Sequence, residues 1–116
     1  MKLFFLKTIF TLALLPLGVS AASLKVDAVA LKLISSDIAY GGCYATLSKK
    51  VAGVCNSTVV SFDCDGVYNK NGAGNRHYST ALLAFSLKKM VNLVVDDVNL
   101  TKQGKYCTVT RISIAQ

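Results

Sequence analysis

Four cysteines, Cys43, Cys55, Cys64 and Cys107, constrain the fold of this 116-residue chain more than any other feature. Three of them fall within a 22-residue stretch, and successive cysteines are separated by 11, 8 and 42 residues. Structural zinc sites need ligand pairs about two to four residues apart, and a catalytic thiol needs a nearby base. The sequence offers neither such pairs nor any histidine besides His77. The cysteines therefore indicate two structural disulfides, for which three pairings exist.

The turn between the first cysteines favours one of these pairings. Residues rich in β-formers flank a turn near Gly53, which predicts a hairpin. A hairpin centred just after Gly53 places Cys43 opposite Cys64, and directly opposed residues have Cβ atoms about 4.5–5.5 Å apart. That separation is close to the disulfide range. Cys55 is then left for Cys107, and this second bridge would tie the hairpin to the last strand.

The N-terminus has the layout of a secretory signal peptide over residues 1–21. A basic start precedes an apolar run of 12 residues at 8–19, and small residues follow. The run is too short for a membrane span, which needs about 20 residues. The predicted cleavage lies between Ala21 and Ala22, and cleavage after Ala22 is the alternative. We therefore expect a secreted or periplasmic protein without a membrane span.

Residues 22–116 are expected to form a single domain with a small core. Cleavage removes Lys2 and Lys7 and no acidic residue, so the formal net charge falls from +7 to +5. A basic domain favours anionic partners. The basic residues are scattered, with pairs only at 49–50 and 88–89. The absence of a basic tract argues against nucleic-acid binding.

Hydrophobic patterns along the chain predict a mainly β fold with one helix. The expected strands are 24–34, 39–50, 55–65, 91–98 and 106–114, and the expected helix is 78–90. This order, β-β-β-α-β-β, is that of a small OB-like β-barrel. A sandwich with a packed helix is the alternative.

Two of these segments carry finer expectations. The alternation of the first strand changes phase, which predicts a β-bulge near residues 27–29. In the helix, Leu83, Leu87 and Met90 recur at helical spacing, and Leu82 and neighbouring apolar residues widen their face. This pattern predicts that the leucine face packs on the core.

With this order, three stretches carry a resemblance to a known family. They are "CYATLSKKVAGVCNSTVVSFDC", "YSTALLAFSLKKMVNLVV" and "GKYCTVTRISI". The chain resembles, over residues 24–115, the B-subunit-like proteins of bacterial subtilase-cytotoxin type. The resemblance implies an OB-fold, assembly into a pentamer and glycan binding. No glycan-contacting residue of that family can be carried over to a position of this sequence.

Tyrosines are the best binding candidates, because each combines a flat apolar ring with a hydroxyl. They are Tyr40, Tyr44, Tyr68, Tyr78 and Tyr106. Tyr68 lies in a Gly- and Asn-rich stretch, 65–76, that reads as a polar surface loop. The residues of this loop predicted to bind a ligand are Tyr68, Asn71, Asn75 and Arg76.

The sequence does not indicate an enzyme, a metal site or a cofactor. Glutamate is absent, and His77 is expected to be a solvated loop residue. Residues 63–72 resemble a calcium loop at first sight, but Val67 and Tyr78 stand where carboxylates are needed. Asp96 and its neighbour would point to opposite faces of a strand.

These observations predict a secreted, non-enzymatic binding module with a glycan or protein partner, which forms rings if it behaves like a toxin B subunit. The alternative is a periplasmic inhibitor or accessory protein that binds another protein.

Overall fold

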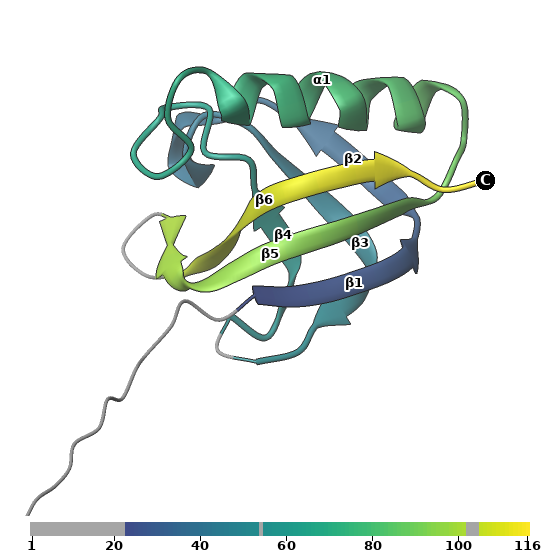
Figure 1. Ribbon diagram of the computed structural model, residues 1–116, viewed down its shortest axis with the longest axis horizontal. Helices are drawn as coiled ribbons and strands as arrows, with labels where there is room; N and C mark the ends of the chain where they lie inside the picture. Colours follow the sequence, from purple (N-terminus) through teal and green to yellow (C-terminus); the bar gives the residue numbers. More distant parts are fainter. Residues whose placement is uncertain (1–22, 54, 102–104) are drawn as a thin grey trace, which may run out of the picture.

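The computed structural model describes residues 23–53, 55–101 and 105–116 (Figure 1). The predicted signal peptide and its cleavage site lie outside these residues. The elements are β1 (Ser23–Val29), β2 (Leu31–Ser35), the 3-10 helix η1 (Ile38–Tyr40), β3 (Tyr44–Val51), β4 (Ser57–Ser61), α1 (Ala73–Ser86), β5 (Val91–Leu100) and β6 (Tyr106–Ile114).

The six strands form one strongly curved sheet in the order β1-β5-β6-β4-β3-β2. The pairing of β4 with β6 is parallel, and the other pairings are antiparallel. The two edge strands, β1 and β2, are separated in the chain by Ala30 alone. The sheet must therefore curl round until its edges approach, although no continuous ladder closes it. The predicted β-dominant, OB-like fold with one helix is confirmed.

The first predicted strand is divided between the two edges of the sheet. Its register against β5 shifts between Val26 and Val29, and Ala28 adopts a left-handed φ of 51°. This is the expected bulge. Beyond it the chain changes partner, since Ala30 donates to Ser48 Oγ at 3.0 Å and accepts from the Ser48 N–H at 2.9 Å. The phase change in the sequence thus marks a switch between two sheet edges.

Both predicted disulfides are present, Cys43–Cys64 and Cys55–Cys107, with Cα atoms 5.7 and 5.6 Å apart. The predicted hairpin register is wrong by two residues, because Tyr44 pairs with Ser61 rather than with Asp63. Cys43 still reaches Cys64 because the chain turns back after β4. Two disulfides indicate an oxidising environment, extracellular or periplasmic.

That turn is made by Asp63, which has a left-handed φ of 55°. The register error itself arises further along the hairpin, where the pairing shifts between Thr46 and Val51. Such an irregularity adds unpaired residues on one strand, and a count outward from an ideal turn misses them.

The helix begins earlier than predicted and presents a different face to the core. It starts at Ala73 rather than at residue 78, and its buried residues are Gly74, Ala81 and Ala84. A Cβ on Gly74 would lie 2.6 Å from the carbonyl oxygen of Asp63. Because the helix approaches the sheet this closely, its fully buried positions hold only small residues. Tyr78 is the larger side chain that packs inward from this helix, edge-on against Phe62.

The leucine face therefore points outward, contrary to the prediction. Leu83, Leu87 and Met90 are 53%, 55% and 51% exposed. The core is instead filled by strand residues, among which the largest buried side chains are Phe62, Leu93 and several valines. In Figure 1, α1 lies over one side of the curved sheet, where it packs across β6 and β2. Among the described residues, no helix has the length and hydropathy that a membrane crossing requires.

Candidate ligand-binding face

Three of the five tyrosines come together on the surface, and we call Tyr40, Tyr44 and Tyr106 the tyrosine cluster. The rings of Tyr40 and Tyr44 stack with centroids 4.2 Å apart and planes at 29°. The ring of Tyr106 lies 5.0 Å from Tyr40 at 43°. All three side chains are partly exposed. The cluster therefore gathers three partly exposed aromatic rings at one place on the surface.

The members of the cluster come from three separate segments of the chain. Tyr40 ends η1, Tyr44 begins β3, and Tyr106 begins β6. In OB-type barrels, the second and third strands and the loops beside them form the usual ligand face. In this fold that face corresponds to β3, β4 and the loops before β3 and before β6. The three tyrosines lie at the start of β3, in the loop before it and at the start of β6.

A tight turn positions Tyr40. Asp37 caps η1 by accepting the N–H of Ala39 at 2.8 Å. Gly41 follows with a left-handed φ of 81°. The Ser61 hydroxyl donates to the Tyr40 carbonyl at 2.8 Å. The Tyr40 backbone is thus fixed from both sides.

Gly41 is required here for a second reason. A Cβ at this position would overlap the side chain of Thr101 and lie 2.8 Å from the hydroxyl of Ser61. The turn therefore rests directly on β4 and on the end of β5. The Cys43–Cys64 bridge adds a covalent link from this turn to the segment after β4.

Buried hydroxyls connect the strands beneath the cluster. The hydroxyls of Thr101 and Thr108 lie 2.6 Å apart, and Thr108 also donates to the Asn99 carbonyl at 2.8 Å. Thr101 and Thr108 are 4% and 0% exposed, so they support the cluster rather than contact a ligand. Satisfied buried networks of this kind hold a surface rigid. A preorganised face loses less entropy when it binds.

The predicted binding loop forms a different structure from the one expected. Asn71 and Asn75 are exposed, and Asn75 and Arg76 belong to the first turn of α1 rather than to a loop. Arg76 Nη1 donates to the Asn71 carbonyl at 2.9 Å. Tyr68 is 42% exposed. The structure thus joins Asn71 to Arg76, whereas the stacked aromatic surface involves other tyrosines.

The interior of this loop is built around a buried carboxylate. Asp63 is 0% exposed and accepts the N–H groups of Val67, Tyr68 and Asn69 at 3.2, 2.6 and 2.6 Å. The Asn69 side chain in turn donates to two carbonyls, those of Phe62 and Val109, at 2.8 Å each. Asp63 and Asn69 are therefore structural residues. The described residues contain no cluster of acidic, histidine or cysteine side chains that could hold a metal ion.

Two other titratable residues singled out from the sequence, His77 and Asp96, have pKa values set by burial and by neighbouring groups of the fold. His77 lies within α1 and is partly buried, not in a solvated loop. Burial and the adjacent Arg76 charge lower its pKa, against a backbone hydrogen bond at Thr110 that raises it. Burial raises the pKa of Asp96, but hydrogen bonds from Asn99 and Val98 outweigh it and leave that pKa lowered. Neither residue belongs to a group of convergent catalytic side chains.

In comparisons with known proteins, no family model, curated protein or solved structure matches the chain. The sequence alone did not predict the tyrosine cluster, because Tyr106 lies far from Tyr40 and Tyr44 in the chain. The sequence did carry one signal: Tyr44 and Tyr106 each adjoin a disulfide cysteine, and Tyr40 lies three residues before Cys43.

Proposed function

We propose that this protein is a secreted, non-enzymatic binding module that holds a sugar ring of a glycan against its tyrosine cluster. One observation carries the proposal. Tyr40, Tyr44 and Tyr106 converge from three segments to centroid distances of 4.2 and 5.0 Å and remain partly exposed. An aromatic surface that is neither buried nor scattered suits a flat ligand with one apolar face.

The chemistry of a sugar ring matches this surface. Its C–H groups can pack on the exposed parts of the three rings, and its hydroxyls can exchange hydrogen bonds with the phenolic groups. Barrels of the OB type bind oligosaccharides on the corresponding strands. The backbone of the cluster is fixed by the Ser61 and Asp37 hydrogen bonds, so binding would need little rearrangement.

The charge of the domain indicates which glycans to test first. The formal net charge of +5 without the predicted signal peptide favours acidic sugars over neutral ones. Lys105 is exposed and precedes Tyr106 in the chain. We therefore propose oligosaccharides that carry sialic acid as the preferred class, with neutral oligosaccharides as the comparison.

Assembly into a ring belongs to the same proposal, and it rests on the resemblance to toxin B subunits. Several identical sites on one ring would strengthen weak single-site binding to a glycan-coated surface. Native mass spectrometry of the disulfide-bonded protein tests this directly. A five-fold assembly supports the ring, whereas a monomer at every concentration argues against it.

The glycan site is tested with an immobilised panel of sialylated and neutral oligosaccharides. Tyr44→Ala and Tyr106→Ala should each weaken binding about tenfold or more, since truncating a tyrosine at the centre of a binding surface costs roughly 2 kcal/mol. Tyr44→Phe keeps the ring and should retain most of the affinity. Tyr68→Ala is the matched control, because Tyr68 is exposed but lies in another loop.

Three outcomes would contradict the proposal in different ways. Unchanged binding by Tyr44→Ala and Tyr106→Ala would remove the cluster from the site. Loss of binding by Tyr68→Ala alone would move the site to the predicted loop. Failure to bind any oligosaccharide, together with an effect on the rate of an enzyme, would favour the inhibitor alternative.

A further inference from the structure

The end of α1 carries an apolar surface that the glycan site does not use. We call Leu82, Leu83, Phe85, Leu87 and Met90 the helix-end patch. Their exposed fractions are 41%, 53%, 42%, 55% and 51%. The fully buried residues of this helix are small. Tyr78 packs against Phe62, whereas the leucines and Phe85 are displayed to solvent. Exposed large apolar side chains gathered at one end of a helix mark a candidate interaction site.

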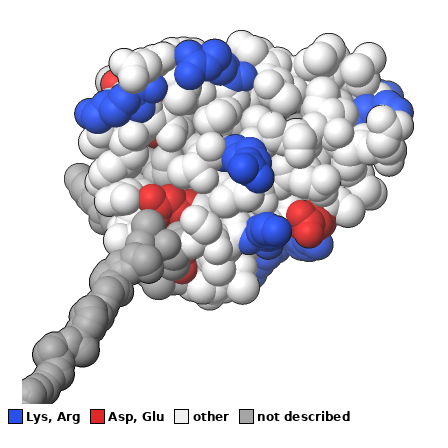
Figure 2. Space-filling model, in the orientation of Figure 1, with Lys and Arg blue, Asp and Glu red and all other residues white. Residues whose placement is uncertain are grey.

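The charges around the patch have one sign. Residues 73–90 contain no acidic side chain, and their basic ones are Arg76, Lys88 and Lys89. Figure 2 shows basic side chains near both ends of α1 and uncharged surface along the helix between them. All six acidic residues of the chain lie in other segments. The helix therefore combines exposed apolar groups with an uncompensated positive charge.

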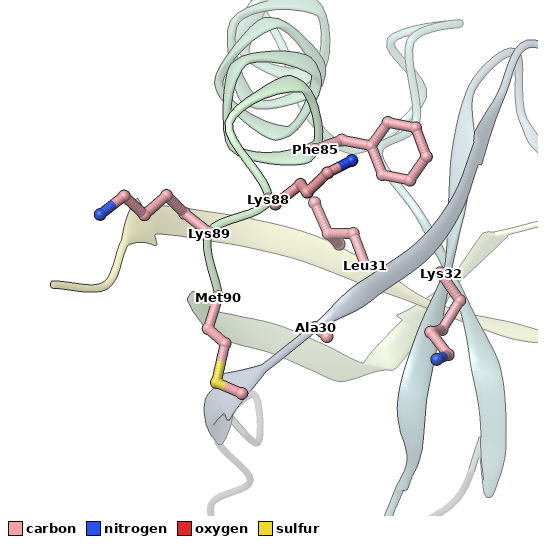
Figure 3. A pocket seen from close by; sticks show the side chains of 7 residues that line it. All are labelled: Ala30, Leu31, Lys32, Phe85, Lys88, Lys89 and Met90. Atoms are coloured by element: carbon pink, nitrogen blue, oxygen red, sulfur yellow. The ribbon is translucent and has the colours of Figure 1, made fainter.

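A groove of about 470 Å³ joins the patch to β2. Leu31, Phe85 and Met90 supply its apolar surface, and Lys32, Lys88 and Lys89 are its charged residues. Figure 3 shows Lys88 extending across the groove toward Phe85 and Leu31, while Lys89 points away into solvent. The apolar stem of Lys88 can stay against the groove while its ammonium group reaches outward.

Charge and composition decide between the candidate occupants. A two-fold contact with a second copy would bring lysines against lysines, which opposes binding. The cores of protein interfaces are depleted in lysine, and their energetic centres rarely rely on leucine. Leucine and phenylalanine beside lysine is instead the composition of helices that lie in the interface of an anionic bilayer.

We propose that the helix-end patch docks on the surface of an anionic lipid bilayer. Leu83 and Leu87, one helical turn apart, enter the boundary between headgroups and acyl chains, and Lys88 and Lys89 contact the anionic headgroups. The tyrosine cluster lies at the other end of β6, because that strand starts at Tyr106 and is followed by Ala115, whose N–H donates to Met90. Membrane docking therefore leaves the cluster free, and the proposal stands independently of the glycan site.

Vesicle flotation of the disulfide-bonded protein tests the proposal. The probes are vesicles with about one-third phosphatidylglycerol in phosphatidylcholine, and vesicles of phosphatidylcholine alone. We expect flotation with the first and at least tenfold less with the second. Raising the salt from about 0.1 M to about 1 M should weaken binding, because it shortens the screening length about threefold.

Paired variants separate the patch from the rest of the surface. Leu83→Ser with Leu87→Ser should reduce partitioning at least tenfold, because about half of each side chain is exposed for insertion. The matched control is Val67→Ser with Val98→Ser, since these residues are 57% and 59% exposed outside the patch. Circular dichroism verifies that each variant is folded.

Charge reversal provides the second pair. Lys88→Glu with Lys89→Glu should abolish binding to the anionic vesicles, since each lysine near such a surface contributes roughly fivefold in affinity. Lys25→Glu with Lys70→Glu changes the net charge equally at exposed positions elsewhere and should retain most of the binding.

The proposal is overturned if the wild-type protein does not float with anionic vesicles, or if the control pairs lose binding as strongly as the patch variants. It is also overturned if the patch variants abolish only self-association, measured by light scattering without vesicles. That result would make a second copy the occupant.

Discussion

The ring of Tyr40 stacks on the ring of Tyr44 at 4.2 Å, although the two residues belong to different elements and are joined by a left-handed turn. The carbonyl of Tyr40 is held by the hydroxyl of Ser61 on β4. The stacking therefore depends on the turn between the two tyrosines as much as on the rings themselves, and this dependence can be tested.

Gly41→Ala should destabilise the protein by about 2–4 kcal/mol, since it adds a left-handed alanine and a clash with Thr101 and Ser61. Gly66→Ala is the control, because Gly66 has a similar φ of 82° but its nearest neighbour would be 3.8 Å away. Thermal unfolding measures both variants. Equal losses would mean that the close contact under Gly41 contributes nothing.

Gly74→Ala should cost about 2 kcal/mol of stability, although alanine is favoured over glycine in helices by about 1 kcal/mol. The added Cβ would meet main-chain atoms of Phe62 and Asp63, which cannot rotate away. Asn75→Ala, next to it on the exposed side of the helix, should be neutral or slightly stabilising. Denaturant midpoints distinguish the two. A stabilised Gly74→Ala variant would disprove the close approach of α1 to the sheet.

Asn69→Ala should destabilise the protein by about 2–4 kcal/mol, because it leaves the carbonyls of Phe62 and Val109 without their partner in a buried site. Asn71→Gly, at an exposed position with a left-handed φ of 58°, should change stability by less than about 0.5 kcal/mol. Chemical denaturation provides the comparison. If the two variants behaved alike, the loop would not be anchored through Asn69.

Acidification should weaken the fold through His77. Its pKa in the folded state lies below the value of 6.5 for an unperturbed histidine, because burial and Arg76 disfavour the charged imidazole. Between pH 6.5 and the lower pKa of the folded state, His77 is protonated more in the unfolded chain than in the folded one. The free energy of unfolding therefore falls as the pH drops from 6.5 toward the folded pKa.

The measurement is the free energy of unfolding between pH 7.5 and 5, compared between the wild type and His77→Gln; both limits bracket the ordinary histidine pKa of about 6.5. The variant should show a flatter profile over this window. A wild-type profile that does not fall on acidification would contradict the lowered pKa.

Local and covalent features of the sequence predicted much of the fold. The cysteine spacing led to both bridges, and the change of alternation near Ala28 located the bulge. The same reasoning placed the wrong face of the helix against the core, because periodicity identifies an apolar face but not what that face contacts. In this chain the inner face is set by Gly74 and its close approach to the sheet.

The candidate site was only partly predictable for a related reason. Tyrosine was chosen for its chemistry, and the choice of Tyr68 followed from its Asn-rich surroundings, which suggested an open loop. The structure uses that loop to enclose Asp63. The contact of Tyr106 with Tyr40 depends on the parallel pairing of β4 with β6, and no local pattern specifies that pairing.

The division of the first strand between two sheet edges also determines the order of folding during synthesis. Ser23 pairs with Asp96, 73 residues further along the chain. Strand β1 therefore stays without its neighbour until most of the chain has been made, and Cys55 keeps a free thiol until Cys107 appears. Loop closure of this length slows folding. The native sheet can therefore be completed only after translation has passed β5 and β6.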